Sequence, residues 1–173
     1  MSSRPPFIIS SADIPETRHR YPKSTEDMAP SRAIGRAAGL LKIGIHLVRL
    51  MPGTRTSFPH AESAEEEFVY VIDGELDAWI DGELHRMQAG DIAAFPAGTG
   101  ICHTFINDGD RDALLLSGGE ADKAENRIHY PLHPGRRNDI PWSRWWDDVP
   151  VRPQGVHDGN PRRVRDVERL GPR

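Results

Sequence analysis

The chain has 173 residues, which is enough for one domain with extended ends and a sizeable buried core. Its formal net charge is only −4, but residues 51–119 carry 13 acidic and three basic side chains. Such an acidic centre repels phosphate backbones and attracts cations, so we expect no nucleic-acid partner for this part of the chain.

The cysteine content and the apolar runs indicate the cellular compartment in which we expect this protein. Cys102 is the single cysteine, so an intrachain disulfide is impossible and a reducing compartment is favoured. Residues 7–9 form too short an apolar run for the core of a signal peptide. The longest later run, residues 68–72, is far below the roughly 20 residues that a membrane helix needs. We therefore expect a soluble, cytoplasmic protein with no membrane partner.

Strand patterns fill the centre of the chain. Residues 1–39 are rich in proline and polar residues without a sustained period, which predicts an irregular N-terminal arm. Alternating or dense apolar patterns then predict strands, and Asp-Gly pairs at 73–74 and 81–82 predict tight hairpin turns. Many short strands with little helix signal indicate an all-β sandwich or barrel over residues 40–119. The predicted strands are residues 43–48, 68–72, 76–80, 92–95, 104–106 and 113–117.

Residues 120–173 contain many prolines but also three of the four tryptophans, Trp142, Trp145 and Trp146. A disordered tail normally lacks such aromatic residues. We therefore predict an irregular C-terminal strap, in which at least residues 127–158 lie against the barrel or against a second subunit.

Four residues within this strand-rich region suit a metal ion. His60 and Glu62 are two positions apart, so alternation places them on one side of a strand. Glu67 begins the next strand and His103 precedes a third. Imidazole and carboxylate ligands together suit one divalent ion of Mn, Fe, Ni, Co or Zn. The alternatives are a barrel that keeps these polar residues without metal, and Glu66 in place of Glu67 as a ligand.

These residues also carry a resemblance to a known family. Glu67 stands seven positions before Gly74, with His60 and Glu62 upstream, and a second set of spacings follows it. The chain thereby resembles the cupin superfamily, and in particular small single-domain bacterial cupins. The resemblance implies a double-stranded β-helix, or jelly-roll barrel, with one divalent transition metal (Zn, Mn, Fe or Ni) and a homodimer. The second motif is carried by Gly90, Pro96, Gly98, His103 and Asn107.

The match to the cupin motifs has three departures. Glu62 stands where the first motif commonly has a second histidine, so the ligand set becomes two histidines and two carboxylates. Six residues instead of five separate Gly53 from His60, and the second motif has two extra residues before His103. The first departure replaces a neutral donor by an anion, which lowers the charge of the bound complex by one.

The resemblance and the ligand set together suggest an enzyme. We expect metal-dependent isomerase, lyase or oxygenase chemistry on a small sugar-like or organic-acid substrate. The alternative is a binding or sensing cupin that captures a small molecule without changing it. Candidate substrate-binding residues are Tyr70, Trp79 and Phe105, although core packing is the default interpretation of each.

Several other residues have two interpretations. His46 could line the pocket or be a structural histidine, and Cys102 could be a redox thiol or a small buried hydrophobe. The His157-Asp158 pair could act as an acid–base pair or simply form a turn. Arg55 and Arg86 could hold an anion, but ordinary solvated arginines are the favoured interpretation.

Overall fold

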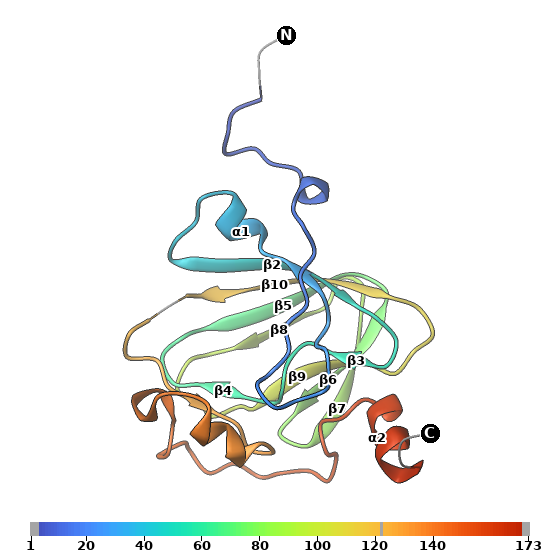
Figure 1. Ribbon diagram of the computed structural model, residues 1–173, viewed down its shortest axis with the longest axis vertical. Coiled ribbons are helices and arrows are strands. Elements are labelled where there is room, and N and C mark those ends of the chain that lie inside the picture. Colours follow the sequence, from blue (N-terminus) through green and yellow to red (C-terminus); the bar gives the residue numbers. More distant parts are fainter. Residues whose placement is uncertain (1–3, 122, 171–173) are drawn as a thin grey trace.

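The computed structural model describes residues 4–121 and 123–170, and antiparallel β-sheet dominates this part of the chain (Figure 1). Two sheets of five and four strands pack together, and a two-stranded ribbon accompanies them. The predicted all-β jelly-roll barrel is confirmed. The larger sheet has the order β1 (Ser31–Arg32), β2 (Ile43–Leu50), β10 (Ala113–Glu120), β5 (Glu67–Asp73), β8 (Ile92–Phe95). The smaller sheet has the order β3 (Thr54–Arg55), β9 (His103–Asn107), β6 (Glu75–Ile80), β7 (Glu83–Gln88), and the ribbon pairs β11 (Ile128–His129) with β4 (Ala61–Glu62).

Helical structure is short and lies outside the two sheets. The arm contains a 3-10 turn, η1 (Ser11–Asp13), and one turn of helix, α1 (Ile34–Ala37). The strap contains η2 (Pro134–Asn138) and η3 (Trp142–Arg144), and α2 (Arg162–Leu170) follows them. No helix in the described ranges is long and apolar enough to cross a membrane.

The Asp-Gly pair at 81–82 forms the predicted hairpin turn, but the hairpin predicted at 73–74 is wrong. This pair joins β5 to β6, which belong to different sheets, so the chain crosses there from one sheet to the other. Asp81 and Gly82 join β6 to β7 with φ values of 47° and 89°, so both residues adopt the left-handed conformation of a two-residue hairpin turn. Asp81 is held in this conformation because its carboxylate accepts hydrogen bonds from Cys102 N at 2.9 Å and Arg152 Nε at 2.6 Å.

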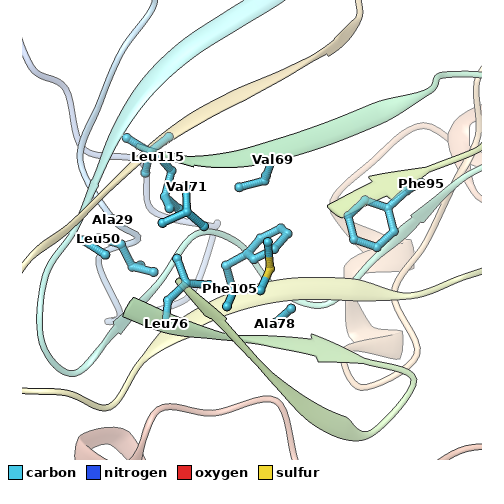
Figure 2. Close-up of a cluster of buried hydrophobic side chains, with 12 residues drawn as sticks. Ala29, Leu50, Val69, Val71, Leu76, Ala78, Phe95, Phe105 and Leu115 are labelled. Atoms are coloured by element: carbon cyan, nitrogen blue, oxygen red, sulfur yellow. The ribbon is translucent and has the colours of Figure 1, made fainter. Parts of the chain in front are cut away.

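Apolar side chains from both sheets fill the space between them (Figure 2). Val69, Val71 and Leu115 extend from the larger sheet, while Leu76 and Phe105 extend from the smaller one. All five are buried. This packed region occupies one part of the barrel, and the polar residues described below lie beyond it.

The strap adds a second apolar layer outside the barrel. Trp145 and Tyr130 pack with Tyr21 of the arm and Phe58 of the barrel. Trp146 packs with Trp79 in a separate cluster. Burial of these aromatic rings explains why a proline-rich segment is ordered, since each ring removes a large apolar area from water.

Candidate metal centre

His60 and His103 lie directly opposite one another on neighbouring chain segments. The backbone of His60 donates to His103 O at 3.2 Å, and His103 N donates to His60 O at 2.9 Å. Residues paired in this way present their side chains on the same face. The two imidazole rings are therefore neighbours, with centroids 5.0 Å apart.

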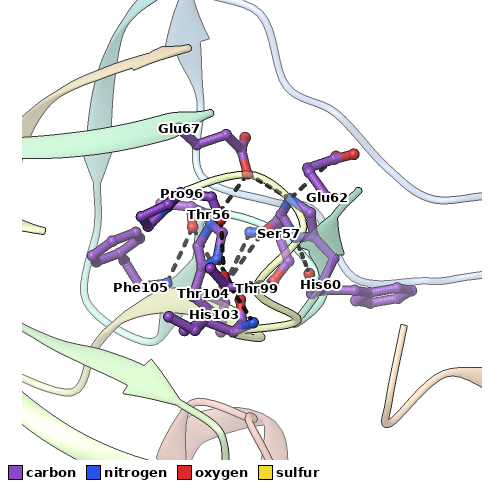
Figure 3. A network of polar contacts seen from close by, with 12 residues as sticks. Thr56, Ser57, His60, Glu62, Glu67, Pro96, Thr99, His103, Thr104 and Phe105 are labelled. Carbon is purple, nitrogen blue, oxygen red and sulfur yellow. Dashed lines mark hydrogen bonds and ion pairs between the residues drawn. The ribbon is translucent and has the colours of Figure 1, made fainter. Parts of the chain in front are cut away.

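Glu67 approaches the two rings from the other sheet. It is the first residue of β5, where it pairs with Phe95 of β8 and Gly119 of β10. Its Oε2 lies 3.3 Å from His103 Nε2 and 3.6 Å from His60 Nε2 (Figure 3). The three side chains thus connect the two sheets at one end of the barrel.

Backbone carbonyls orient both imidazole rings. His60 Nδ1 lies 2.9 Å from Phe58 O, and His103 Nδ1 lies 3.4 Å from Ile101 O. A carbonyl can only accept, so each Nδ1 carries a hydrogen, and each Nε2 faces Glu67. Phe95 stacks on the His103 ring at a centroid distance of 3.5 Å and fixes its plane. This arrangement is typical of metal-binding histidines.

The environment of Glu67 Oε2 suits the binding of a cation. Oε2 is buried and makes no hydrogen bond within the described residues. One ligand atom from each of His60, Glu67 and His103 lies within 4.8 Å of the others. A divalent ion between the three would satisfy the buried oxygen and both nitrogen lone pairs, so the donor set fits a metal of the first transition series.

The charges of the three side chains are strongly coupled. Burial lowers the pKa of His60, but the carboxylates of Glu67 and Glu62 outweigh burial and raise it to about 9. Burial also raises the pKa of Glu67, yet the two imidazoles together hold it well below its usual range. For His103 burial prevails, and its pKa is lowered. The group therefore carries one positive charge on His60 beside an ionised Glu67, where a bound cation would replace the proton.

Glu62 lies beside this group and not within it. Its Oε1 is 3.9 Å from His60 Nε2, and its Oε2 accepts a hydrogen bond from Asn126 of the strap. Burial is the main reason that the pKa of Glu62 is raised to about 7. The structure thus brings together three of the four predicted ligands and places the fourth at their edge.

A cavity of about 200 Å³ opens beside the three side chains. Its walls combine hydroxyl and imidazole groups with apolar residues, of which Phe105 is one. His46, which stands on the inner face of β2, lines it, and burial lowers the pKa of this imidazole. The remaining polar lining consists of His19, Ser31, Thr56, Ser57 and Ser117.

The three aromatic residues predicted to bind substrate occupy different environments. Phe105 lines the cavity. Tyr70 is exposed and lies on the outer face of β5, because alternation places it opposite to Val69 and Val71. Trp79 is fully buried, and its Nε1 donates to His157 O at 2.8 Å. Neither Tyr70 nor Trp79 is among the residues lining this cavity.

Two residues next to the centre were not predicted from the sequence. Asn126 contacts Glu62 from the strap, whose path along the barrel no sequence pattern indicates. Phe95 precedes Pro96 of the second motif, and the register that pairs it with Glu67 could have suggested its place.

Comparisons with known proteins agree with this geometry. The family model described as "Cupin domain" matches residues 46–118, which include all four predicted ligands. "Polyketide synthase CurC" of Streptomyces cyaneus is 28% identical over 116 residues, which are 67% of this chain and 70% of that protein. "Protein SchB" of Streptomyces halstedii is 31% identical over 116 residues, covering 67% of this chain and 78% of the relative.

Solved structures share the fold. A crystal structure of a sugar phosphate isomerase from a cupin superfamily, from Silicibacter pomeroyi, superposes with a TM-score of 0.64 at 32% sequence identity. The superposition covers 71% of this chain and 80% of that one.

Proposed function

Because this chain belongs to the cupin superfamily, we propose that it is a metal-dependent enzyme that acts on a small oxygenated substrate. His60, Glu67 and His103 hold one divalent transition metal in this proposal. The observation that carries it is the cluster of Glu67 Oε2 with two imidazole nitrogens at 3.3 and 3.6 Å, in which one ligand atom from each residue lies within 4.8 Å of the others. A divalent ion held there would supply Lewis-acid chemistry to a hydroxyl or carbonyl oxygen.

The cavity supports a small substrate that carries hydroxyl or carbonyl groups. Its volume of about 200 Å³ is below the range of ordinary drug-sized sites, so the substrate has to be small. Ser31, Thr56 and Ser117 provide hydroxyl groups that can donate to or accept from such a molecule. Phe105 and Val69 provide the apolar wall that limits its size and excludes water.

We favour isomerisation as the reaction. The structure from Silicibacter pomeroyi, which is named a sugar phosphate isomerase, is similar enough to support this class. In the route that we propose, a base removes a proton from the carbon next to the carbonyl to give an enediol, and the proton is returned to the neighbouring carbon. His46 is the residue assigned to that task, because burial keeps its imidazole neutral and able to accept a proton.

Solvent isotope exchange tests the proposed reaction. The metal-loaded protein is incubated in deuterated water with a panel of aldoses, ketoses and hydroxy acids, and exchange at carbon is followed by nuclear magnetic resonance. We expect deuterium at the carbon next to the carbonyl of one compound, and loss of the exchange in His46→Asn with the metal retained. Binding of a compound without exchange or turnover would favour the non-enzymatic alternative, a binding or sensing cupin.

The outer face of the larger sheet supports a homodimer. The dense apolar run of β5 has no polar face, because Val69 and Val71 point to the core while Tyr70 and Ile72 are exposed outside. Ile92 of neighbouring β8 is also exposed, and 64% of its surface is accessible. An apolar face of this kind marks an interaction surface, and a second copy offers the same apolar face across a two-fold axis.

A further inference from the structure

Asn126 joins the strap to the segment that carries the candidate metal ligands. It is buried, with 3% of its surface exposed, and it precedes β11, which pairs with β4. Its Oδ1 accepts from Ala64 N at 3.0 Å and from Ser63 Oγ at 3.4 Å. Its Nδ2 donates to Glu62 Oε2. One amide group therefore contacts the chain on both sides of Ser63.

The position of this amide is fixed from several directions. Arg144 Nη1 donates to Lys123 O at 2.7 Å and to Asn126 O at 3.1 Å, which holds the turn before β11. Arg127 N donates to Ser63 Oγ at 2.7 Å, and Ser63 N donates to Arg127 O at 2.9 Å. Because these contacts anchor Asn126, the hydrogen bond from its side chain holds the Glu62 carboxylate in place.

The hydrogen bond determines where the Glu62 carboxylate points. One oxygen, Oε1, lies 3.9 Å from His60 Nε2, while the other, Oε2, accepts from Asn126 of the strap. Glu67, by comparison, places a single oxygen between both imidazole nitrogens. We propose that Asn126 is a positioning residue that holds Glu62 back from the metal, so that two imidazoles and one carboxylate bind the ion. This inference rests on the proposed function.

Withholding Glu62 has a chemical consequence for the site. Two coordinating carboxylates would cancel the charge of a divalent cation, whereas one leaves a net positive charge to polarise a substrate oxygen. It also leaves more coordination positions open for that substrate. Asn126 would therefore tune both the charge and the accessibility of the centre without being a ligand.

A double-mutant cycle on metal affinity tests the inference. Mn²⁺ dissociation constants are measured by competition with a chelator for the wild type, Glu62→Gln, Asn126→Asp and the double variant. Asn126→Asp retains an oxygen for Ala64 N and Ser63 Oγ but replaces the donor to Glu62 with an acceptor. We expect Asn126→Asp to bind Mn²⁺ at least about tenfold tighter, a gain of about 1.4 kcal/mol, because Glu62 becomes free to coordinate.

The remaining variants distinguish coordination of the metal by Glu62 from the effect of an added negative charge. Glu62→Gln alone should change the affinity less than about threefold, and in the double variant it should remove most of the tenfold gain. Asn138→Asp, which adds the same charge at an exposed position of η2, should leave the affinity unchanged. The absorption spectrum of Co²⁺-loaded protein should change between wild type and Asn126→Asp, because the number of ligands changes.

Asn126→Ala keeps the test decisive if Asn126→Asp fails to fold, since it removes the donor without adding charge and should show the same Glu62-dependent gain. A tenfold loss of affinity in Glu62→Gln alone would overturn the inference, because Glu62 would then already be a ligand. Equal affinities for wild type, Asn126→Asp and Asn126→Ala would overturn it as well. Absence of metal binding by the wild type is a different result, which contradicts the proposed function itself.

Discussion

Arg55 shows how strongly a single buried charge depends on its partners. Its Nε and Nη2 donate to the two oxygens of Glu26 at 2.9 and 2.6 Å, and its Nη1 donates to Gly159 O at 2.7 Å. Only 1% of the residue is exposed, so the prediction of a solvated arginine is wrong. No sequence pattern indicates Glu26 as its partner, because Glu26 lies in the irregular arm.

Removal of the Arg55 side chain should therefore destabilise the protein markedly. We expect Arg55→Ala to lower the free energy of unfolding by about 3 kcal/mol, because the Glu26 carboxylate and a buried carbonyl lose their partner. Chemical denaturation measures the change. Arg86→Ala is the matched control, since Arg86 is 58% exposed in its pair with Asp77 and should cost at most about 1 kcal/mol. Similar losses for the two variants would contradict the account.

Among the elements, the turn between β6 and β7 packs against the strap. A Cβ atom on Gly82 would lie 2.5 Å from Gly155 O, whereas one on Gly90 would meet nothing within 4 Å. Both glycines have positive φ, of 89° and 98°. Alanine would therefore strain the backbone at both positions, but it would clash with a neighbouring segment only at Gly82.

This difference predicts unequal costs for the two substitutions. Gly90→Ala should destabilise by about 1–2 kcal/mol from backbone strain alone. Gly82→Ala should lose at least about 1 kcal/mol more, because the strap has to move away from the turn. Thermal unfolding of both variants compares them. An equal shift in the midpoint of unfolding would show that the strap does not pack against this turn in solution.

Strands with a clear local sequence pattern could be predicted, and strands without such a pattern could not. The alternation in β2 and β6 and the Asp-Gly turn at 81–82 made these elements predictable. β7 was not predicted, since five of its six residues are exposed and give no apolar period. β4 and β11 have two residues each, and their residue pairs are 66 and 68 positions apart in the sequence, so only tertiary structure reveals them. The spacing of His60, Glu67 and His103 predicted their meeting, whereas the contact of Asn126 with Glu62 depends on that long-range pairing.

At the scale of the whole molecule, the apolar outer face of the larger sheet predicts self-association. The chain mass is 19.3 kDa, and sedimentation should give about twice this value for the wild type. Ile92→Glu should shift the protein to the monomer, because a charge would be buried in the interface. Leu84→Glu, on exposed β7 of the other sheet, should remain dimeric. A monomeric wild type at micromolar concentration would contradict the homodimer.

Metal binding by His60, Glu67 and His103 is open to a simple experiment, elemental analysis of the purified protein. Protein purified without chelator, alongside His60→Ala, should contain about one transition metal ion per chain in the wild type and almost none in the variant. His85→Ala, on exposed β7, should retain the ion. Wild-type protein that binds no Mn²⁺, Fe²⁺, Ni²⁺ or Zn²⁺ even after addition, or a His60→Ala variant that retains full metal content, would contradict the claim.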